Sequence, residues 1–237
     1  HHLVDLPAMM PLIALSGGLS LVIAATPSEP WPMRARWRQI GHPIGMITLW
    51  VLLITSGIWS TSVYATYYNA LSAPFGDNGD RDYRAAAERI DDVIQMDPQI
   101  ATYNFTQGYL YALAADSGDE TALTAAIDSF TAYTELEPTD AIGWANLAAL
   151  YWQSDQPTDG LNAIVNAAAL APDSWQIWAM FGAYQESIGF TDQAVIAYDA
   201  ALKVNSRVAY YPFWQETDTR QRMAERYTLN PLDQITE

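Results

Sequence analysis

Histidine and cysteine, which supply most catalytic bases and many metal ligands, are scarce in this chain. Cysteine does not occur, and the three histidines are His1, His2 and His42. A serine or cysteine nucleophile needs a histidine base, and the common zinc sites need histidine or cysteine ligands. Lys203 is the only lysine of residues 67–237, and no glycine-rich phosphate loop of the usual spacing is present. The sequence therefore predicts neither catalytic residues nor a cofactor in residues 67–237.

Clustered carboxylates between residues 77 and 82 are the remaining candidate for a metal site. Asp77, Asp80 and Asp82 offer oxygen ligands of the kind that calcium accepts, but the spaced ligands and closing glutamate of an EF-hand are missing. Asn78-Gly79 suits a tight turn, and Asp80 or Asp82 suits the N-cap of a following helix. The turn and the cap are the favoured interpretation, with calcium as the alternative.

Acidic residues dominate the charge of the chain. Its 237 residues contain 11 Lys+Arg and 27 Asp+Glu, and half are apolar. Residues 1–66 hold three arginines and two acids, so residues 67–237 hold eight basic and 25 acidic residues, a net charge of −17. Such a surface repels phosphate backbones. Nucleic acid is therefore excluded as an expected partner.

Two long apolar runs stand near the start of the chain. Residues 3–25 are almost wholly apolar after Asp5, and residues 44–66 contain no charged residue. Each run approaches the ~20 residues that a helix needs to cross the bilayer core. The sequence predicts a hydrophobic helical hairpin over residues 1–66, with membrane segments at 3–25 and 44–66. Two buried core helices are the alternative.

The segment between the two runs suggests an orientation. Residues 26–43 contain several prolines and three arginines, and we expect a short loop there. Basic loops favour the cytoplasmic side of a membrane. This places residues 67–237 in a periplasmic or extracellular space, anchored in a bacterial cytoplasmic membrane or released to the cell surface.

Pro98, Pro138 and Pro172 stand at nearly regular intervals along the rest of the chain. The step from Pro138 to Pro172 has the length of roughly 34 residues that is typical of tetratricopeptide solenoids, in which each repeat is a pair of antiparallel helices. A second step of the same length leads to Ser206. Pro98 precedes Pro138 by a somewhat longer step, and we assign the surplus to residues 117–122, between two helical patterns. The sequence therefore predicts an array of helical repeats.

Small and large side chains recur in step with this period. In the unit that starts at Ala141 they fall at i, i+3, i+4 and i+7, which is one face of a helix, and the other units share part of this pattern. The small positions suit the close approach of two helices in a hairpin. The predicted repeat core consists of Ala86, Ile90, Gly108, Tyr111, Ala126, Phe130, Trp144, Leu147, Ala148, Tyr151, Gly160, Ile164, Trp178, Phe181, Gly182, Ala194, Tyr198 and Ala201.

These residues resemble the tetratricopeptide-repeat (TPR) family over about residues 82–206. The resemblance implies an all-α solenoid of about three full repeats, preceded by a half-repeat and followed by a capping tail. The expected boundaries are 67–206 for the array, with units 67–98, 101–138, 141–172 and 175–206, and 207–237 for the cap. Asn104, Gln107 and Gln185 depart from the large side chains that the family has at these positions.

Stacked hairpins expose a groove and two open ends that suit protein partners. We expect a non-catalytic interaction and assembly module that self-associates into a ring or filament, its aromatic tail lying on a neighbouring copy. With one lysine and few arginines, a clamp for acidic peptide ends is not expected. Aromatic side chains outside the repeat columns are the candidate contacts. They are Trp152, Trp175, Tyr210, Tyr211, Phe213 and Trp214.

A second resemblance concerns the first third of the chain. The opening His1-His2-Leu3-Val4-Asp5-Leu6-Pro7, the arginine-rich turn, the last apolar run and the repeats that follow are similar to the C-terminal end of O-antigen ligase-like polysaccharide transferases. The resemblance implies that the catalytic residues of such an enzyme lie outside this chain. The alternative function is therefore the non-catalytic tail of a membrane transferase.

Overall fold

The computed structural model describes residues 32–72 and 82–229, with side chains described from residue 45 onward. The chain divides into two units, His1–Ser72 and Ala73–Glu237, and each unit is described by itself. The predicted membrane segment 3–25 and the candidate ligands Asp77 and Asp80 lie outside the described residues.

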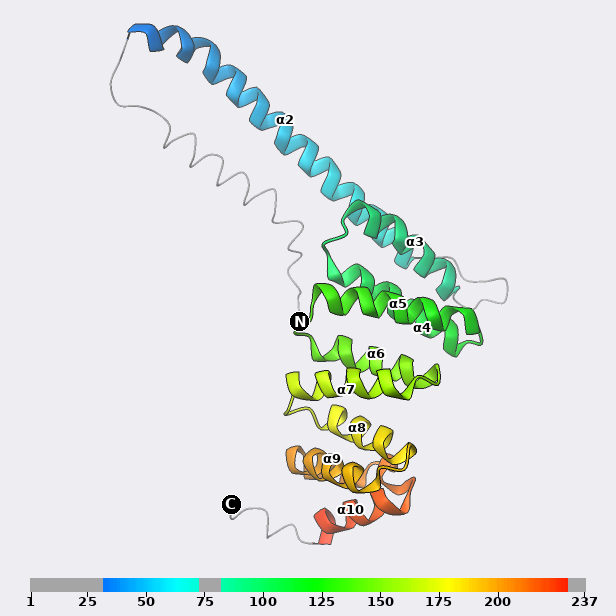
Figure 1. The fold of residues 1–237 in the computed structure, drawn as a ribbon. Helices are drawn as coiled ribbons and strands as arrows, with labels where there is room; N and C mark the ends of the chain where they lie inside the picture. Colours follow the sequence, from blue (N-terminus) through cyan, green and yellow to red (C-terminus); the bar gives the residue numbers. More distant parts are fainter. Residues whose placement is uncertain (1–31, 73–81, 230–237) are drawn as a thin grey trace. The chain divides into compact units, whose positions relative to one another are not determined.

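The described part of the first unit is one long helix, α2 (Pro32–Leu71) (Figure 1). Its stretch Gly45–Leu71 is the one helix of the described residues that is long and apolar enough to cross a membrane. The predicted loop over residues 26–43 is wrong from Pro32 onward, because the helix already begins there. Proline is well tolerated at a first helical position, where its missing N–H needs no partner, and arginine, alanine and methionine then favour helix.

The second unit is a stack of helical hairpins (Figure 1). Contacts are densest within the pairs α4/α5, α6/α7 and α8/α9, and each pair meets the element before it through α3/α4, α5/α6 or α7/α8. No strand occurs in residues 32–72 or 82–229. The prediction of an all-α solenoid is confirmed. The helices are α3 (Tyr83–Met96), α4 (Ala101–Asp116), α5 (Glu120–Leu136), α6 (Ala141–Gln153), α7 (Pro157–Leu170), α8 (Trp175–Ser187) and α9 (Thr191–Val204).

Short polar turns separate the helices. Side-chain oxygens of Asp140 and Ser174 accept backbone N–H groups at the starts of α6 and α8, which satisfies donors that a helix leaves unpaired. Within each hairpin, the residue just after the C-cap of the first helix has a positive φ. These residues are Gly118 at 104°, Asp155 at 58° and Gly189 at 87°. Glycine adopts this conformation without steric cost, so Asp155 is the strained member of the three.

Side-chain volume is matched across the hairpins. In the first full repeat, a Cβ atom on Gly108 would lie 2.7 Å from the ring of Phe130, which is 1% exposed. In the second repeat the same two positions hold Ala148 and Ile164, both fully buried. A larger residue on one helix thus accompanies a smaller residue on the other, as close packing of two helices requires.

Two tryptophans attach the first helix of a repeat to the loop before it. The indole N–H groups of Trp144 and Trp178 donate to the backbone oxygens of Pro138 and Pro172, both at 2.9 Å. Since each bond spans six residues, it fixes how the chain enters α6 and α8. Asn104 takes this position in α4 and is 6% exposed.

The last described segment covers the end of the array. It comprises η1 (Ser206–Tyr210), η2 (Pro212–Gln215) and α10 (Asp218–Leu229), and we call residues 206–229 the cap. Its α10 and η1 contact α9. Trp214 in η2 is fully buried and meets the ring of Tyr198 edge to face at 5.5 Å. The apolar surface that a terminal repeat would expose is thereby covered, as solenoids require for solubility.

Candidate functional site

The predicted repeat-core residues lie inside the second unit. Those that are half-buried are the aromatic residues Trp144, Tyr151, Trp178 and Phe181. The buried ones are Ala86, Ile90, Gly108, Tyr111, Ala126, Phe130, Leu147, Ala148, Gly160, Ile164, Gly182, Ala194, Tyr198 and Ala201.

The predicted aromatic contacts of the tail separate into buried and exposed residues. Trp214 is 0% exposed and Phe213 is half-buried, so the expectation that Trp214 is an exposed contact is wrong. The reason is that the tail folds back on its own last repeat, where Tyr198 receives both rings. Tyr210 and Tyr211 remain 75% and 50% exposed.

The two other aromatic candidates also make contacts within the chain. Trp152 of α6 stacks on Tyr184 of α8, with ring centres 4.1 Å apart and planes 6° from parallel. Burial raises the pKa of Tyr184 to about 12. Trp175 meets Tyr211 edge to face at 5.6 Å. Trp152 therefore joins two repeats, while Trp175 and Tyr211 form a partly exposed aromatic pair.

The carboxylates form no metal site in the described part of the chain. Asp82 accepts the backbone N–H of Ala85 at 2.9 Å and caps α3. Over residues 32–72 and 82–229, no three His, Cys, Asp or Glu side chains are grouped so that they could hold a metal ion. Asp82 has the role of a helix cap.

The most elaborate polar cluster joins the cap to the last repeat. Arg220 donates to Glu186 at 3.0 Å and to the hydroxyl of Tyr198 at 2.9 Å, and its guanidinium lies 4.2 Å from the centre of the Phe213 ring. Thr217 donates to Glu186 at 2.8 Å. Burial by itself raises the pKa of Glu186, but the hydrogen bonds from Tyr198 and Thr217 and the charge of Arg220 outweigh it, so the net pKa is lowered. This cluster holds the cap in place, and its carboxylate is already fully engaged.

A surface that the sequence pattern did not single out runs along the first helices of the three hairpins. These helices, α4, α6 and α8, are called the A helices below. Their partners α5, α7 and α9 are the B helices. Equivalent positions at i, i+4 and i+7 share one face of each A helix and are exposed or half-buried. We define this groove face by Thr102, Thr106 and Tyr109 on α4, Ile142, Asn146 and Ala149 on α6, and Gln176, Met180 and Ala183 on α8.

The groove face carries no charged side chain. Asp116 and Glu186 are the only charged residues of the A helices. Asp116 is the last residue of α4 and accepts the amide of Gln153, while Glu186 is held by the cap. The repeat period could have located this surface, because it fixes the positions between the buried columns as firmly as the columns themselves.

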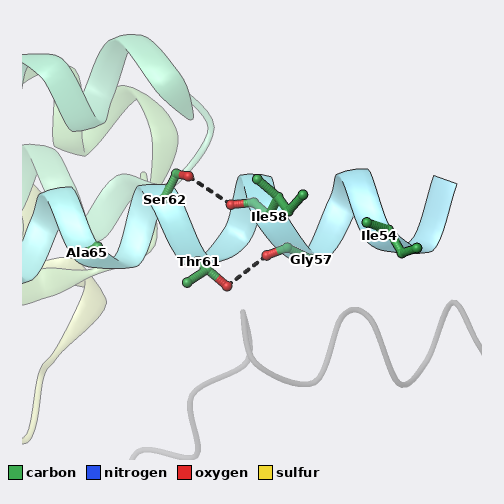
Figure 2. Close-up of a pocket in the computed structure, with 6 residues that line it drawn as sticks. All are labelled: Ile54, Gly57, Ile58, Thr61, Ser62 and Ala65. Carbon is green, nitrogen blue, oxygen red and sulfur yellow. Dashed lines mark hydrogen bonds between the residues drawn. The ribbon is translucent and has the colours of Figure 1, made fainter. Parts of the chain in front are cut away.

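The described part of α2 presents a different surface (Figure 2). Among the residues that the structure describes, those lining a shallow depression of about 540 Å³ belong to this helix. Thr61 and Ser62 donate their hydroxyl protons to the backbone oxygens of Gly57 and Ile58, both at 2.8 Å. These hydroxyls are thus satisfied within the helix. The lining residues are Ile54, Gly57, Ile58, Thr61, Ser62 and Ala65.

Helical hairpins stacked in sequential pairs, with small and large residues matched across each pair, define a tetratricopeptide-repeat fold. Solved structures agree with this class. A crystal structure of MamA protein is 19% identical, with a TM-score of 0.56, and the match covers 75% of this chain and 92% of that chain. MamA 41-end from Desulfovibrio magneticus RS-1 is 15% identical, with a TM-score of 0.52 over 74% of this chain and 92% of that one.

Another crystal structure of MamA is 21% identical, with a TM-score of 0.52 over 65% of this chain and 89% of that chain. At these identities the likeness shows the fold alone. No protein-family model and no curated protein sequence matches the chain.

Proposed function

We propose that this chain is a non-catalytic protein-interaction module whose groove face binds an extended segment of a partner protein. The observation that carries the proposal is the row of neutral, exposed or half-buried side chains on the A helices. Ile142 and Tyr109 are 61% and 53% exposed. Solenoids use such extended surfaces for binding, and exposed aromatic and aliphatic side chains are frequent anchors.

Selection from a random-peptide display library tests the proposal. The full chain should enrich related peptides, and Ile142→Glu, which puts a charge in the middle of the groove face, should weaken their binding at least about tenfold, the loss typical of one anchor residue. Ile196→Glu is the matched control, because Ile196 is also exposed, at 69%, but lies on the B helix α9. Equal loss in both variants, or no enriched peptide, would refute the proposal.

We also propose that α2 anchors the module in a bacterial cytoplasmic membrane, with the repeats on the periplasmic or extracellular side. Large apolar side chains are exposed along the helix, among them Ile47, Leu52 and Ile58 at 61–62%. The hydroxyl groups of Thr61 and Ser62 bond to the helix backbone, as a lipid environment demands. Because the chain has no cysteine, Ala149→Cys introduces a single label site. A membrane-impermeant maleimide should label it in intact spheroplasts, and labelling only after lysis would contradict this orientation.

We further propose that the module binds other copies of itself and so assembles into a ring or filament. The cap lies on the array's own last repeat, so a head-to-tail contact made by the tail would require the cap of one copy to move onto the next copy, and so on along the assembly. Such a contact is heterologous and leads to a ring or an open filament. Sedimentation and electron microscopy at rising concentration should show assemblies, and monomers at every concentration would exclude this form.

The alternative remains the C-terminal part of an O-antigen ligase-like transferase, which the apolar start of the chain favours. A gene that encodes about ten further membrane spans before His1, enough for a polytopic protein, would support it. The repeats would then serve the enzyme as a docking module, so the groove face has the same role in both hypotheses.

A further inference from the structure

We infer that the segment bound by the groove face is uncharged along the stretch that contacts the A helices, and combines apolar side chains with hydroxyl or amide side chains. This inference rests on the proposed function and specifies the partner. Its basis is that all nine residues of the groove face are neutral in a chain with a net charge of −16. Every charge of the repeats lies elsewhere.

Basic groups that could pair with an acidic partner are missing from helices α4 to α8. No lysine or arginine occurs between Ile90 and Leu202, a stretch that includes α4 to α8 entirely. The acidic residues of this stretch create a negative field around the face. A carboxylate brought there would be repelled, and no cation would compensate for the water it loses.

Acidic groups that could pair with a basic partner are missing from the face itself. Glu186 accepts from Arg220, Tyr198 and Thr217 and its side chain is 15% exposed. Asp116 stands at the end of α4. A lysine or arginine placed over the middle of the face would therefore give up hydration without gaining a partner. Basic residues can be accommodated only beyond its ends.

The face offers instead a mixture of apolar area and neutral polar groups. Tyr109, Ile142 and Met180 supply apolar contact, one from each A helix. The amides of Asn146 and Gln176 can donate to and accept from the backbone of an extended chain. A partner segment with neutral side chains satisfies both kinds of group and leaves no buried charge unpaired.

The peptides enriched by the full chain provide the test. Their affinities are measured by fluorescence anisotropy at about 0.05 M and about 0.5 M salt, a range that screens exposed charge pairs. The expected result is a shared neutral core, a Kd that changes less than about twofold with salt, and a loss of about tenfold or more when either Lys or Glu replaces a central residue. Enriched peptides with charged cores, whose affinity falls about tenfold with salt, would overturn the inference and leave the proposed function standing.

A second variant controls for the library. Asn146→Lys gives the face a cation, and peptides with acidic cores should then be enriched. If the wild-type chain also selects acidic cores, the inference is wrong. If no peptide is enriched, or if Ile142→Glu binds the enriched peptides unchanged, the proposed function fails and the inference falls with it.

Discussion

Replacing Gly108 by alanine should have opposite effects on stability in two backgrounds. In the wild-type chain the new Cβ would lie 2.7 Å from one ring carbon of Phe130 and 2.9 Å from another. Neither side can yield easily, because Phe130 is 1% exposed and packs edge to face on Phe105 at 5.3 Å. If isoleucine replaces Phe130, the pair becomes alanine with isoleucine, which is the combination that the second repeat already uses at Ala148 and Ile164.

The magnitudes follow from two opposing terms. Overpacking a core typically costs about 1–3 kcal/mol, whereas alanine in place of glycine favours a helix by about 1 kcal/mol. For a clash with a buried ring we take the upper part of the first range, so Gly108→Ala should destabilise the wild type by about 1–2 kcal/mol. Phe130→Ile alone should cost about 1–3 kcal/mol. In that background Gly108→Ala should restore about 1 kcal/mol, because the clash is gone and the helix preference remains.

Equilibrium urea unfolding of the full chain in detergent, followed by circular dichroism, measures both effects. With an m value of about 2 kcal/mol/M, the single variant should lower the midpoint by about 0.5–1 M. Ala149→Gly, at an exposed site on α6, measures the helix-preference term by itself. A Gly108→Ala effect of the same sign and size with phenylalanine and with isoleucine at position 130 would show that the two positions are not coupled, and would refute the packing argument.

Three further predictions concern turns and the cap. Asp155→Gly should increase the free energy of unfolding by about 0.5–1 kcal/mol, because glycine adopts a positive φ without strain. The urea midpoint should therefore rise, and a lower midpoint would contradict this. Arg220→Met should cost about 2–4 kcal/mol, since the half-buried Glu186 would lose its cation. Hydrogen exchange should accelerate in the cap but not in α4–α7, and uniform acceleration would argue against a local role. Acid should also loosen the cap. The pKa of Glu186 is lowered in the folded chain, so the unfolded chain takes up the proton first as pH falls below the ordinary value near 4.5, and the stability present above that pH is progressively lost. Glu186→Gln should flatten this dependence between pH 5 and pH 3, as monitored by the urea midpoint, and an unchanged pH profile would exclude Glu186 as its source.

The repeat architecture could be predicted because small and large side chains recur at a fixed spacing along the sequence. The departures at Asn104 and Gln107 could not be explained in the same way. In the structure Gln107 donates to the backbone oxygen of Ala87 at 3.2 Å and to Asp91, and accepts from Ser129 at 3.0 Å. It therefore links three helices by hydrogen bonds where other repeats use apolar contact. Such a partnership depends on residues 16 and 22 positions away, which no local pattern reveals.

The cap shows a second limit of the sequence pattern. The repeat period ends at Ser206, so it assigns Phe213 and Trp214 to no core position, and the sequence alone predicts them to be contact residues. Their burial depends on η1 and η2 turning the chain back over α9. The start of α2 differs from the sequence prediction because prolines suggest a loop, although Pro32 stands at a position where a helix readily begins.

The distribution of lysine and arginine has a practical consequence for mapping this protein. Trypsin cuts after these residues, and the sites nearest to the three hairpins are Arg89 and Lys203. Digestion, even of the denatured chain, will leave the three hairpins up to Lys203, near the end of α9, as one large fragment, and Lys203 is the one lysine that an amine-reactive cross-linker can reach in them. Contacts with a partner should therefore be mapped with photoreactive or carboxylate-directed reagents and a protease specific for acidic residues.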